Sequence, residues 1–229
     1  MVKYKNLLLI GTSHIAIESV KEVENKILET KPDVVALELD RPRLQGLLQK
    51  KKPSGHISIK DIRRIGVKGV LFAMVAAWVE KTLGNYVGVK PGSEMVSAFH
   101  AAHKVSARVA LVDQDISVTV KRLSSGFSWR EKWNLFVDLI KGFVFRKKEI
   151  SFDLHKVPSQ KIVDELIGKV KKRYPTLYRV LVKERNEVMA KNLYSLMQKF
   201  ENIIAVVGAG HEEELIALIK KEEKIHDRV

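Results

Sequence analysis

The sequence predicts an α/β protein with a central, mostly parallel β-sheet flanked by helices and a basic helical insertion. Short apolar runs typical of buried strands alternate with helical stretches, which is the order that βαβ units produce. Two of these runs, LLLIG at 7–11 and IAVVG at 204–208, each end in a glycine that stands three residues before a histidine. The α/β core therefore opens and closes the chain. At 229 residues, we expect one domain over 1–229.

The N-terminal part is predicted to form a βαβ unit. Residues 6–11 form a buried apolar run, and 18–30 follow as a helix that Pro32 stops. The apolar face of that helix consists of Val20, Val23, Ile27 and Leu28. VVALEL at 34–39 is a second buried strand. The two strands should lie parallel with a right-handed crossover.

The same alternation continues after a polar stretch. An apolar helix is predicted from about residue 68 to 81, and a second helix from 94 to about 104. ARVALVD at 107–113 then provides a third buried strand.

The pattern changes between residues 117 and 172, which are helical and basic and contain no convincing strand. We interpret 117–172 as a helical insertion within the domain. A long helix from about 175 to 200 leads to the fourth strand, IIAVVG at 203–208. A short helix should begin at His211.

Composition excludes several kinds of chemistry. The chain has no cysteine, so disulfides, thiolate metal sites and cysteine nucleophiles are ruled out. The N-terminal apolar run is too short for a signal peptide, and the run at 67–81 contains Lys68 and Glu80 and falls short of the ~20 residues that span a bilayer. The net charge of +14 suits an acidic partner such as a lipid surface or an acidic substrate, or simply keeps the protein soluble.

Four polar residues stand at or just after the ends of the predicted strands: His14, Glu38, Asp113 and His211. In open α/β sheets, functional residues gather outside the carboxyl ends of parallel strands, so these four should meet at one edge. Two histidines and a carboxylate match the ligand set of open zinc sites and also suit manganese or cobalt. The alternative is that each histidine only caps or hydrogen-bonds its loop.

Other candidates have simpler interpretations. GAGHEE begins like a dinucleotide-binding loop, but Glu213 replaces the last glycine and adjacent acids would repel a pyrophosphate. Acids in this first helical turn complement the helix dipole. His100 and His103 should be solvated, and Glu94 in a first turn is by default a capping or dipole residue.

Six blocks in order resemble the TraB family, the pheromone-shutdown proteins of the TraB/PrgY type, which are distantly related to the Tiki metalloproteases. The blocks are GTSH, PDVVALELDRPR, GVKPGSEMVSAFHAAHK, ARVALVDQD, LVKERNEVMA and AVVGAGH, and they span about residues 7–219. The resemblance implies an erythromycin-esterase-like or ChaN-like α/β core. It also implies a membrane-associated protein that acts on peptides through a divalent metal ion.

The resemblance assigns roles to individual positions. It implies metal ligation by His14, His211 and Glu38, and catalytic or substrate-binding roles for the residues in the acidic and basic blocks. These are Glu38 and Arg43 in ELDRPR, Glu94 in PGSE, Asp113 in VDQD, and Arg185 in KERN, where Glu184 also matches the family pattern. Gln114 departs from the family, which commonly has arginine between the two aspartates, and a neutral amide lacks the charged bidentate contact of a guanidinium.

The first hypothesis is therefore a metal-dependent peptide hydrolase that inactivates peptide signals, with Mn, Co or Zn as cofactor and no organic cofactor. Glu94 or Glu38 would be the general base, and Arg43 or Arg185 would hold an oxyanion or a peptide carboxylate. The alternative is a peptide-binding or membrane-associated scaffolding module without turnover, in which the arginines and glutamates are structural ion pairs. We expect a homo-oligomer, no nucleic-acid partner, and a core domain that is cytoplasmic or attached to a membrane from the cytoplasm. Many family members have C-terminal membrane helices that this sequence lacks.

An aromatic stripe lies within the predicted insertion. Trp129, Trp133, Phe136, Ile140 and Phe143 recur at helical spacing, flanked by Arg130, Lys132, Lys141 and Arg146. The stripe either packs on the core, forms a homodimer contact, or lies on an anionic bilayer.

Overall fold

The computed structural model describes residues 1–12, 17–49, 92–145 and 168–226, and the predicted helix at 68–81 lies outside them. The described residues contain a five-stranded sheet with the order β1-β2-β5-β3-β4. Its strands are β1 (Val2–Tyr4), β2 (Leu7–Thr12), β3 (Val34–Leu37), β4 (Arg108–Leu111) and β5 (Ile203–Gly208). All neighbours are parallel except β1, which pairs antiparallel with β2. The predicted mostly parallel α/β fold is confirmed.

The register brings the two ends of the chain together. β2 and β5 are adjacent, with Leu7 opposite Ile203 and Thr12 opposite Gly208. β3 lies on the other side of β5, with Leu37 opposite Val206 and Leu111 of β4. All four parallel strands thus point their carboxyl ends to one edge of the sheet.

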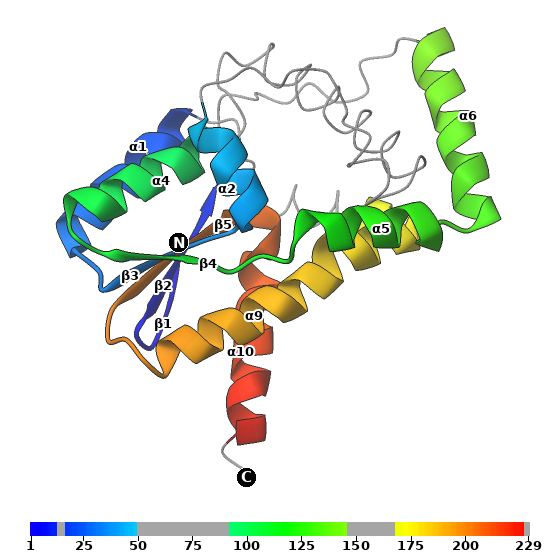
Figure 1. Ribbon diagram of the computed structural model, residues 1–229. Helices are drawn as coiled ribbons and strands as arrows, with labels where there is room; N and C mark the ends of the chain where they lie inside the picture. The colour runs from blue at the N-terminus through cyan, green and yellow to red at the C-terminus, as the bar shows by residue number, and fades with distance from the viewer. Residues whose placement is uncertain (13–16, 50–91, 146–167, 227–229) are drawn as a thin grey trace.

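One face of the sheet is covered by α1 (Ile17–Thr30) and α4 (Ser93–Lys104), which lie side by side (Figure 1). Both helices are amphipathic, and their apolar stripes pack on the sheet. Val23 and Ile27 of α1, with Met95, Ala98, Ala101 and Ala102 of α4, join sheet residues in a buried cluster. The predicted apolar face of the first helix is therefore confirmed at these two positions. His100 and His103 are exposed on α4, as predicted.

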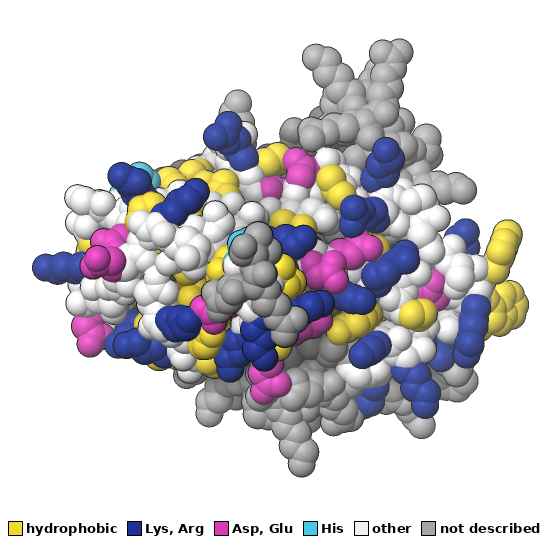
Figure 2. All heavy atoms as spheres, turned by 90° about the horizontal axis from the view of Figure 1, so that it is seen from below, with side chains coloured by type: hydrophobic (Ala, Val, Ile, Leu, Met, Phe, Trp, Pro, Cys, Tyr) yellow, Lys and Arg dark blue, Asp and Glu magenta, His cyan; other side chains and the backbone are white. Residues whose placement is uncertain are grey.

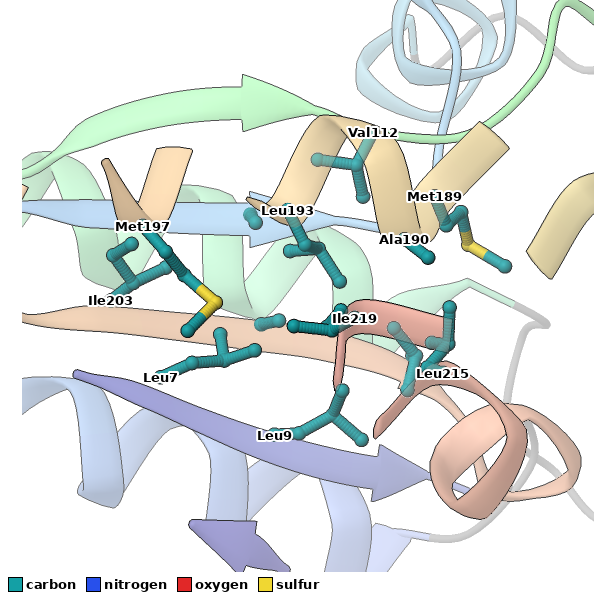
Figure 3. Close-up of a cluster of buried hydrophobic side chains, with 13 residues drawn as sticks. Leu7, Leu9, Val112, Met189, Ala190, Leu193, Met197, Ile203, Leu215 and Ile219 are labelled. Carbon is teal, nitrogen blue, oxygen red and sulfur yellow. The ribbon is translucent and has the colours of Figure 1, made fainter. Parts of the chain in front are cut away.

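The other face is covered by α9 (Glu184–Met197) and α10 (Glu212–His226). Met189, Leu193 and Met197 of α9 recur at helical spacing and pack with Leu215 and Ile219 of α10 over Leu7, Leu9 and Ile203 (Figure 3). Helices on both faces bury both sides of β5, which explains why its residues form a continuous apolar run.

Two elements were missing from the sequence prediction. β1 is a three-residue, largely exposed edge strand, too short to give a periodic signal. The helix α2 (Arg41–Leu48) contains no buried residue, so it has no apolar stripe. Its start was nevertheless marked in the sequence, because Asp40 caps it by accepting a hydrogen bond from the Arg43 N–H at 2.8 Å, with Pro42 in the first turn.

The described part of the predicted insertion is helical. It comprises α5 (Ile116–Gly126), α6 (Trp129–Phe145) and a helical segment at 168–173. α8 (Pro175–Tyr178), a π-helical turn (Arg179–Lys183) and α9 then run on as the long predicted helix, which ends at Met197 rather than 200. In Figure 1, α6 stands at the end of the molecule away from the sheet. Within the described residues, no helix is long and apolar enough to cross a bilayer.

Candidate functional site

The candidate site lies at the carboxyl edge of the sheet, where three of the predicted residues meet. Glu38 directly follows β3, Asp113 lies two residues beyond β4, and His211 ends the 3-10 turn (Ala209–His211) that follows β5. All three are buried. His14, the fourth predicted residue, lies outside the described residues, but β2, which leads to it, is the direct neighbour of β5.

Arg185 joins the ends of two strands from α9. Its guanidinium donates to Glu38 Oε1 and forms hydrogen bonds of 2.6–3.2 Å with both carboxylate oxygens of Asp113. The remaining nitrogen, Nη1, donates to the carbonyl of Leu181 in the π-helical turn at 3.1 Å. Burial lowers the pKa of Arg185, but the Glu38 charge and the Asp113 hydrogen bonds raise it by more, so the pKa ends above its usual value. Arg185 is thus a fully charged, fixed cation between two buried carboxylates.

A second arginine approaches the same cluster from α2. Arg43 Nη2 donates to Asp113 Oδ2 at 2.5 Å, and its Nε donates to Asp40 Oδ1 at 3.2 Å. Asp40 also accepts a hydrogen bond from the N–H of Ile116, the first residue of α5, which joins the start of α2 to the start of α5. The Arg43 side chain is 28% exposed, compared with 15% for Arg185, so Arg43 is the more accessible cation.

The ring orientation of His211 is set by a chain of side chains from α9 and α10. Asn186 Nδ2 donates to Glu214 Oε2 at 2.9 Å, so its carbonyl oxygen is the atom that faces His211 Nδ1 at 2.5 Å. Because an ionised carboxylate only accepts hydrogen bonds, the Asn186 amide has one orientation, and Nδ1 of His211 must carry the proton. The other nitrogen, Nε2, faces Glu38 Oε1 at 3.4 Å.

Glu38 is held in place by a second donor on its other oxygen. The backbone N–H of Gly208 donates to Glu38 Oε2 at 2.6 Å. The carboxylate therefore bridges the end of β5, Arg185 and the imidazole of His211. We call Glu38, Asp113, Arg185 and His211 the strand-end cluster.

Glu94 and Gln114 occupy other parts of this edge. Glu94 lies in the first turn of α4 as predicted, and its side chain is buried. α4 runs back toward the start of β4, so this turn lies on the carboxyl side of the sheet. Gln114 is buried and donates from Nε2 to Thr119 Oγ1 at 3.1 Å, so the amide has a structural partner on α5.

The glutamates after the second glycine motif do more than complement the helix dipole. Glu212 accepts a hydrogen bond from the Gly11 N–H at 2.8 Å, and Glu214 holds Asn186. A Cβ on Gly11 would lie 2.3 Å from the carboxyl carbon of Glu212, so any larger residue there would displace this side chain. Glu212 thus holds the end of β2 and Glu214 holds Asn186 of α9, whereas Glu213 is exposed.

Asn186, Glu214 and Asp40 were not assigned to the site from the sequence. Asn186 had a signal: it occupies a position of the apolar stripe of α9 that continues through Met189, Ala190 and Leu193, and it is fully buried. A polar residue on an apolar helix face needs a hydrogen-bond partner. Neither Glu214 nor Asp40 had such a signal, because acids in first turns and caps are common.

Two donor atoms at this edge suit a hard or borderline divalent cation. His211 Nε2 and Glu38 Oε1 are a nitrogen and an oxygen donor of the kind that zinc, manganese and cobalt accept. The described residues contain no group of three His, Asp or Glu side chains arranged to hold a metal ion. A complete set therefore requires a donor from elsewhere, and the sequence predicts His14 for that role.

Comparison with known proteins shows the family to which the chain belongs. The TraB/PrgY/gumN family profile matches residues 3–224. An uncharacterized protein of Methanocaldococcus jannaschii is 32% identical over 225 residues, covering 97% of this chain and 55% of the relative. TraB domain-containing proteins of Bos taurus and Homo sapiens are 27% and 26% identical over 228 residues, covering 89% of this chain and 59% and 60% of theirs. The chain spans less than two thirds of the length of these relatives. With a match from the first strand to the last helix, this chain belongs to the TraB/PrgY/gumN family.

Proposed function

We propose that this chain is a metal-dependent peptide hydrolase, with the metal held between His211, Glu38 and His14. The observation that carries the proposal is the pair formed by His211 Nε2 and Glu38 Oε1 at 3.4 Å. If Nδ1 carries the only ring proton, the lone pair of Nε2 points at a carboxylate oxygen. Two lone pairs repel unless a cation or a second proton lies between them.

The hydrogen bonds around this pair support the proposed role in metal binding. Metal-binding histidines usually donate their other ring N–H to a carbonyl or carboxylate, which fixes the tautomer, and Asn186 accepts that N–H here. Glu38 is likewise fixed by Arg185 and the Gly208 N–H. A bound divalent ion would supply Lewis-acid chemistry, polarising a peptide carbonyl and lowering the pKa of a water.

Other residues at this edge would serve as the general base and as the cation that binds the substrate. Glu94, buried in the first turn of α4 on this side of the sheet, or Glu38 would act as the general base. Arg43 is the accessible cation and would bind a developing oxyanion or a peptide carboxylate. Arg185 positions Glu38 and Asp113 rather than touching the peptide.

One feature favours the second candidate, a peptide-binding module without turnover. Arg43 pairs with Asp113, and Arg185 pairs with both Asp113 and Glu38, which is the connected arrangement expected of a structural ion-pair network. In that case the protein would keep the fold and bind peptides at this edge without cleaving them.

Metal binding is tested by thermal unfolding with added Mn²⁺, Co²⁺ or Zn²⁺. Because the site cannot exist in the unfolded chain, metal at about 100 times Kd should stabilise the protein by about 2.7 kcal/mol, which raises Tm by roughly 5–10 °C. His211→Ala and His14→Ala should each remove this shift, and lowering the pH below about 6 should weaken it, because only neutral histidine binds metal. His100→Ala is the matched control, because His100 is exposed on α4.

Two results separate the alternatives. The metal site would be refuted if none of the three metals raised the Tm of the parent protein and if His211→Ala lowered the stability of the metal-free protein. If metal binds, digestion of a mixed-peptide library by the metal-loaded protein distinguishes a hydrolase from a binding module, with Glu94→Gln as the inactive control for the hydrolase.

A further inference from the structure

The helix α6 has its polar face toward the protein and its tryptophans toward solvent. Trp129 is 85% exposed and Trp133 is 66% exposed, whereas Glu131 on the same helix is 2% exposed. The core-packing interpretation of the aromatic stripe is therefore wrong for both tryptophans. Large apolar side chains left together on one helix face mark a binding surface.

The polar face of α6 makes the contacts that hold the helix to the rest of the chain. Glu131 accepts hydrogen bonds from Ser128 and from the Thr176 N–H, at 2.6–3.0 Å. One turn on, Asn134 Nδ2 donates to the carbonyl of Arg173 at 3.2 Å, and Asp138 pairs with Arg173. These residues recur at steps of three and four, so they form one stripe along the helix.

Helix geometry places the tryptophans opposite that stripe. At 100° per residue, Trp129 and Trp133 lie about 40° apart, and both lie more than 90° from Asn134, Glu131 and Asp138. The packing partners of α6 thus fix its rotation and leave the tryptophan face outward. We call Trp129, Trp133, Arg130 and Lys132 the tryptophan face.

Basic side chains accompany these aromatic groups. Arg130 and Lys132 are both exposed, and Lys132 Nζ lies 5.2 Å from the ring centroid of Trp129. Figure 2 shows hydrophobic and basic side chains next to each other at the end of the molecule where α6 stands. The chain as a whole has a net charge of +14.

We propose that the tryptophan face lies on an anionic lipid bilayer, with the indole rings at the level of the head groups and the basic side chains against lipid phosphates. Tryptophan favours this interface because its ring is apolar and its N–H is polar, and each nearby lysine or arginine adds attraction to an anionic leaflet. This attachment is independent of the proposed hydrolase.

Charge argues against a second copy of the chain as the occupant. In a twofold dimer the same patch meets itself, so the basic residues Arg130 and Lys132 of one copy would approach those of the other. Like charges in a contact are unfavourable, and neither residue has an acidic neighbour on the tryptophan face.

The test is co-sedimentation of the full chain with vesicles of phosphatidylcholine alone or mixed with 40% phosphatidylserine. Anionic vesicles should bind the parent protein, neutral ones should bind at least tenfold more weakly, and added salt should reduce binding. Trp129→Ser with Trp133→Ser should reduce binding at least tenfold, as should Arg130→Gln with Lys132→Gln. Ile225→Ser, an exposed apolar residue on α10, should leave it unchanged.

Tryptophan fluorescence of the parent protein gives a second measurement that needs no variant. Anionic vesicles should shift the emission to the blue, and lipids brominated near the head group should quench it. Three results would overturn the proposal: no binding to anionic vesicles at low salt, unchanged binding by the double tryptophan variant, or a dimer in light scattering that this variant abolishes while vesicles do not bind.

Discussion

At the scale of single residues, Asn186 has the most specific geometry in the strand-end cluster. It is fully buried on α9, with one end of its amide on Glu214 and the other on His211. The amide therefore fixes the imidazole ring of His211 relative to Glu214 on α10. Its role is to position His211, and it is not expected to touch a substrate.

Replacing Asn186 by alanine should weaken metal binding about 10- to 100-fold, the usual cost of losing such a support for a ligand. Apo stability should fall by about 1–3 kcal/mol, because the His211 N–H and Glu214 lose their buried partner. Thermal-shift titration with metal measures the first effect, and the ¹⁵N chemical shifts of the His211 ring report the tautomer, which structural damage alone would not change.

Asn192→Ala is the matched control, because Asn192 is on the same helix and donates only to the carbonyl of Val112. It should leave the metal response intact. Parent-like metal affinity and tautomer in Asn186→Ala would show that the ring is held by other contacts.

At the scale of secondary-structure elements, the start of α6 depends on one buried carboxylate. Ser128 and Glu131 form a reciprocal capping box, and Glu131 also accepts the Thr176 N–H at the start of α8. Burial raises the pKa of Glu131, but the hydrogen bonds from Ser128 and Thr176 outweigh it, so the pKa is lowered. One side chain thus caps two helices and sets the rotation of the tryptophan face.

Glu131→Gln should destabilise the protein by about 1–3 kcal/mol at pH 7, because an amide offers one acceptor oxygen instead of two. A pKa that is lower in the folded state stabilises the protein above the unfolded value, about 4.3, and that contribution is lost as the pH falls through the folded pKa. The difference between parent and variant, measured by urea unfolding, should therefore shrink below about pH 4.

Glu22→Gln on the exposed side of α1 serves as the control and should change stability little at either pH. A difference for Glu131→Gln that stays constant from pH 7 to pH 3 would show that the charge on Glu131 contributes little.

At the scale of the whole molecule, Arg185 ties the helix α9 to the ends of β3 and β4. Its partners Glu38 and Asp113 are 147 and 72 positions away in the sequence. β5 lies beside β3 in the sheet, and α10 packs with α9. This one guanidinium therefore joins parts of the chain that meet only in the folded state.

Arg185→Leu should destabilise the protein by about 3–5 kcal/mol, because it leaves Glu38 and Asp113 buried without their shared cation. Arg43→Leu should cost less, since Arg43 is more exposed and Asp113 keeps Arg185. Urea unfolding of both variants at pH 7 checks the order. Equal losses would mean that the two arginines contribute alike to the fold.

The sequence by itself determined the α/β class, the parallel strands and the buried positions Val23 and Ile27 on the apolar face of α1. It also indicated that Glu38, Asp113 and His211 gather at one edge. These features follow from local patterns, because hydrophobic burial repeats with the period of a helix or strand and parallel strands end at the same edge. Resemblance to the family added Arg43 and Arg185, for which the local pattern gave no structural partner.

Only the tertiary structure decided which polar groups pair. The contacts between Asn186 and Glu214, and between Glu131 and Thr176, depend on how helices are rotated against each other. The direction of the α6 tryptophans was likewise left open by the sequence, because an aromatic stripe predicts an apolar face but not what covers it. The periodicity of a sequence reports how one segment is buried, whereas a hydrogen bond requires two segments at a definite distance and angle, which only the folded chain fixes.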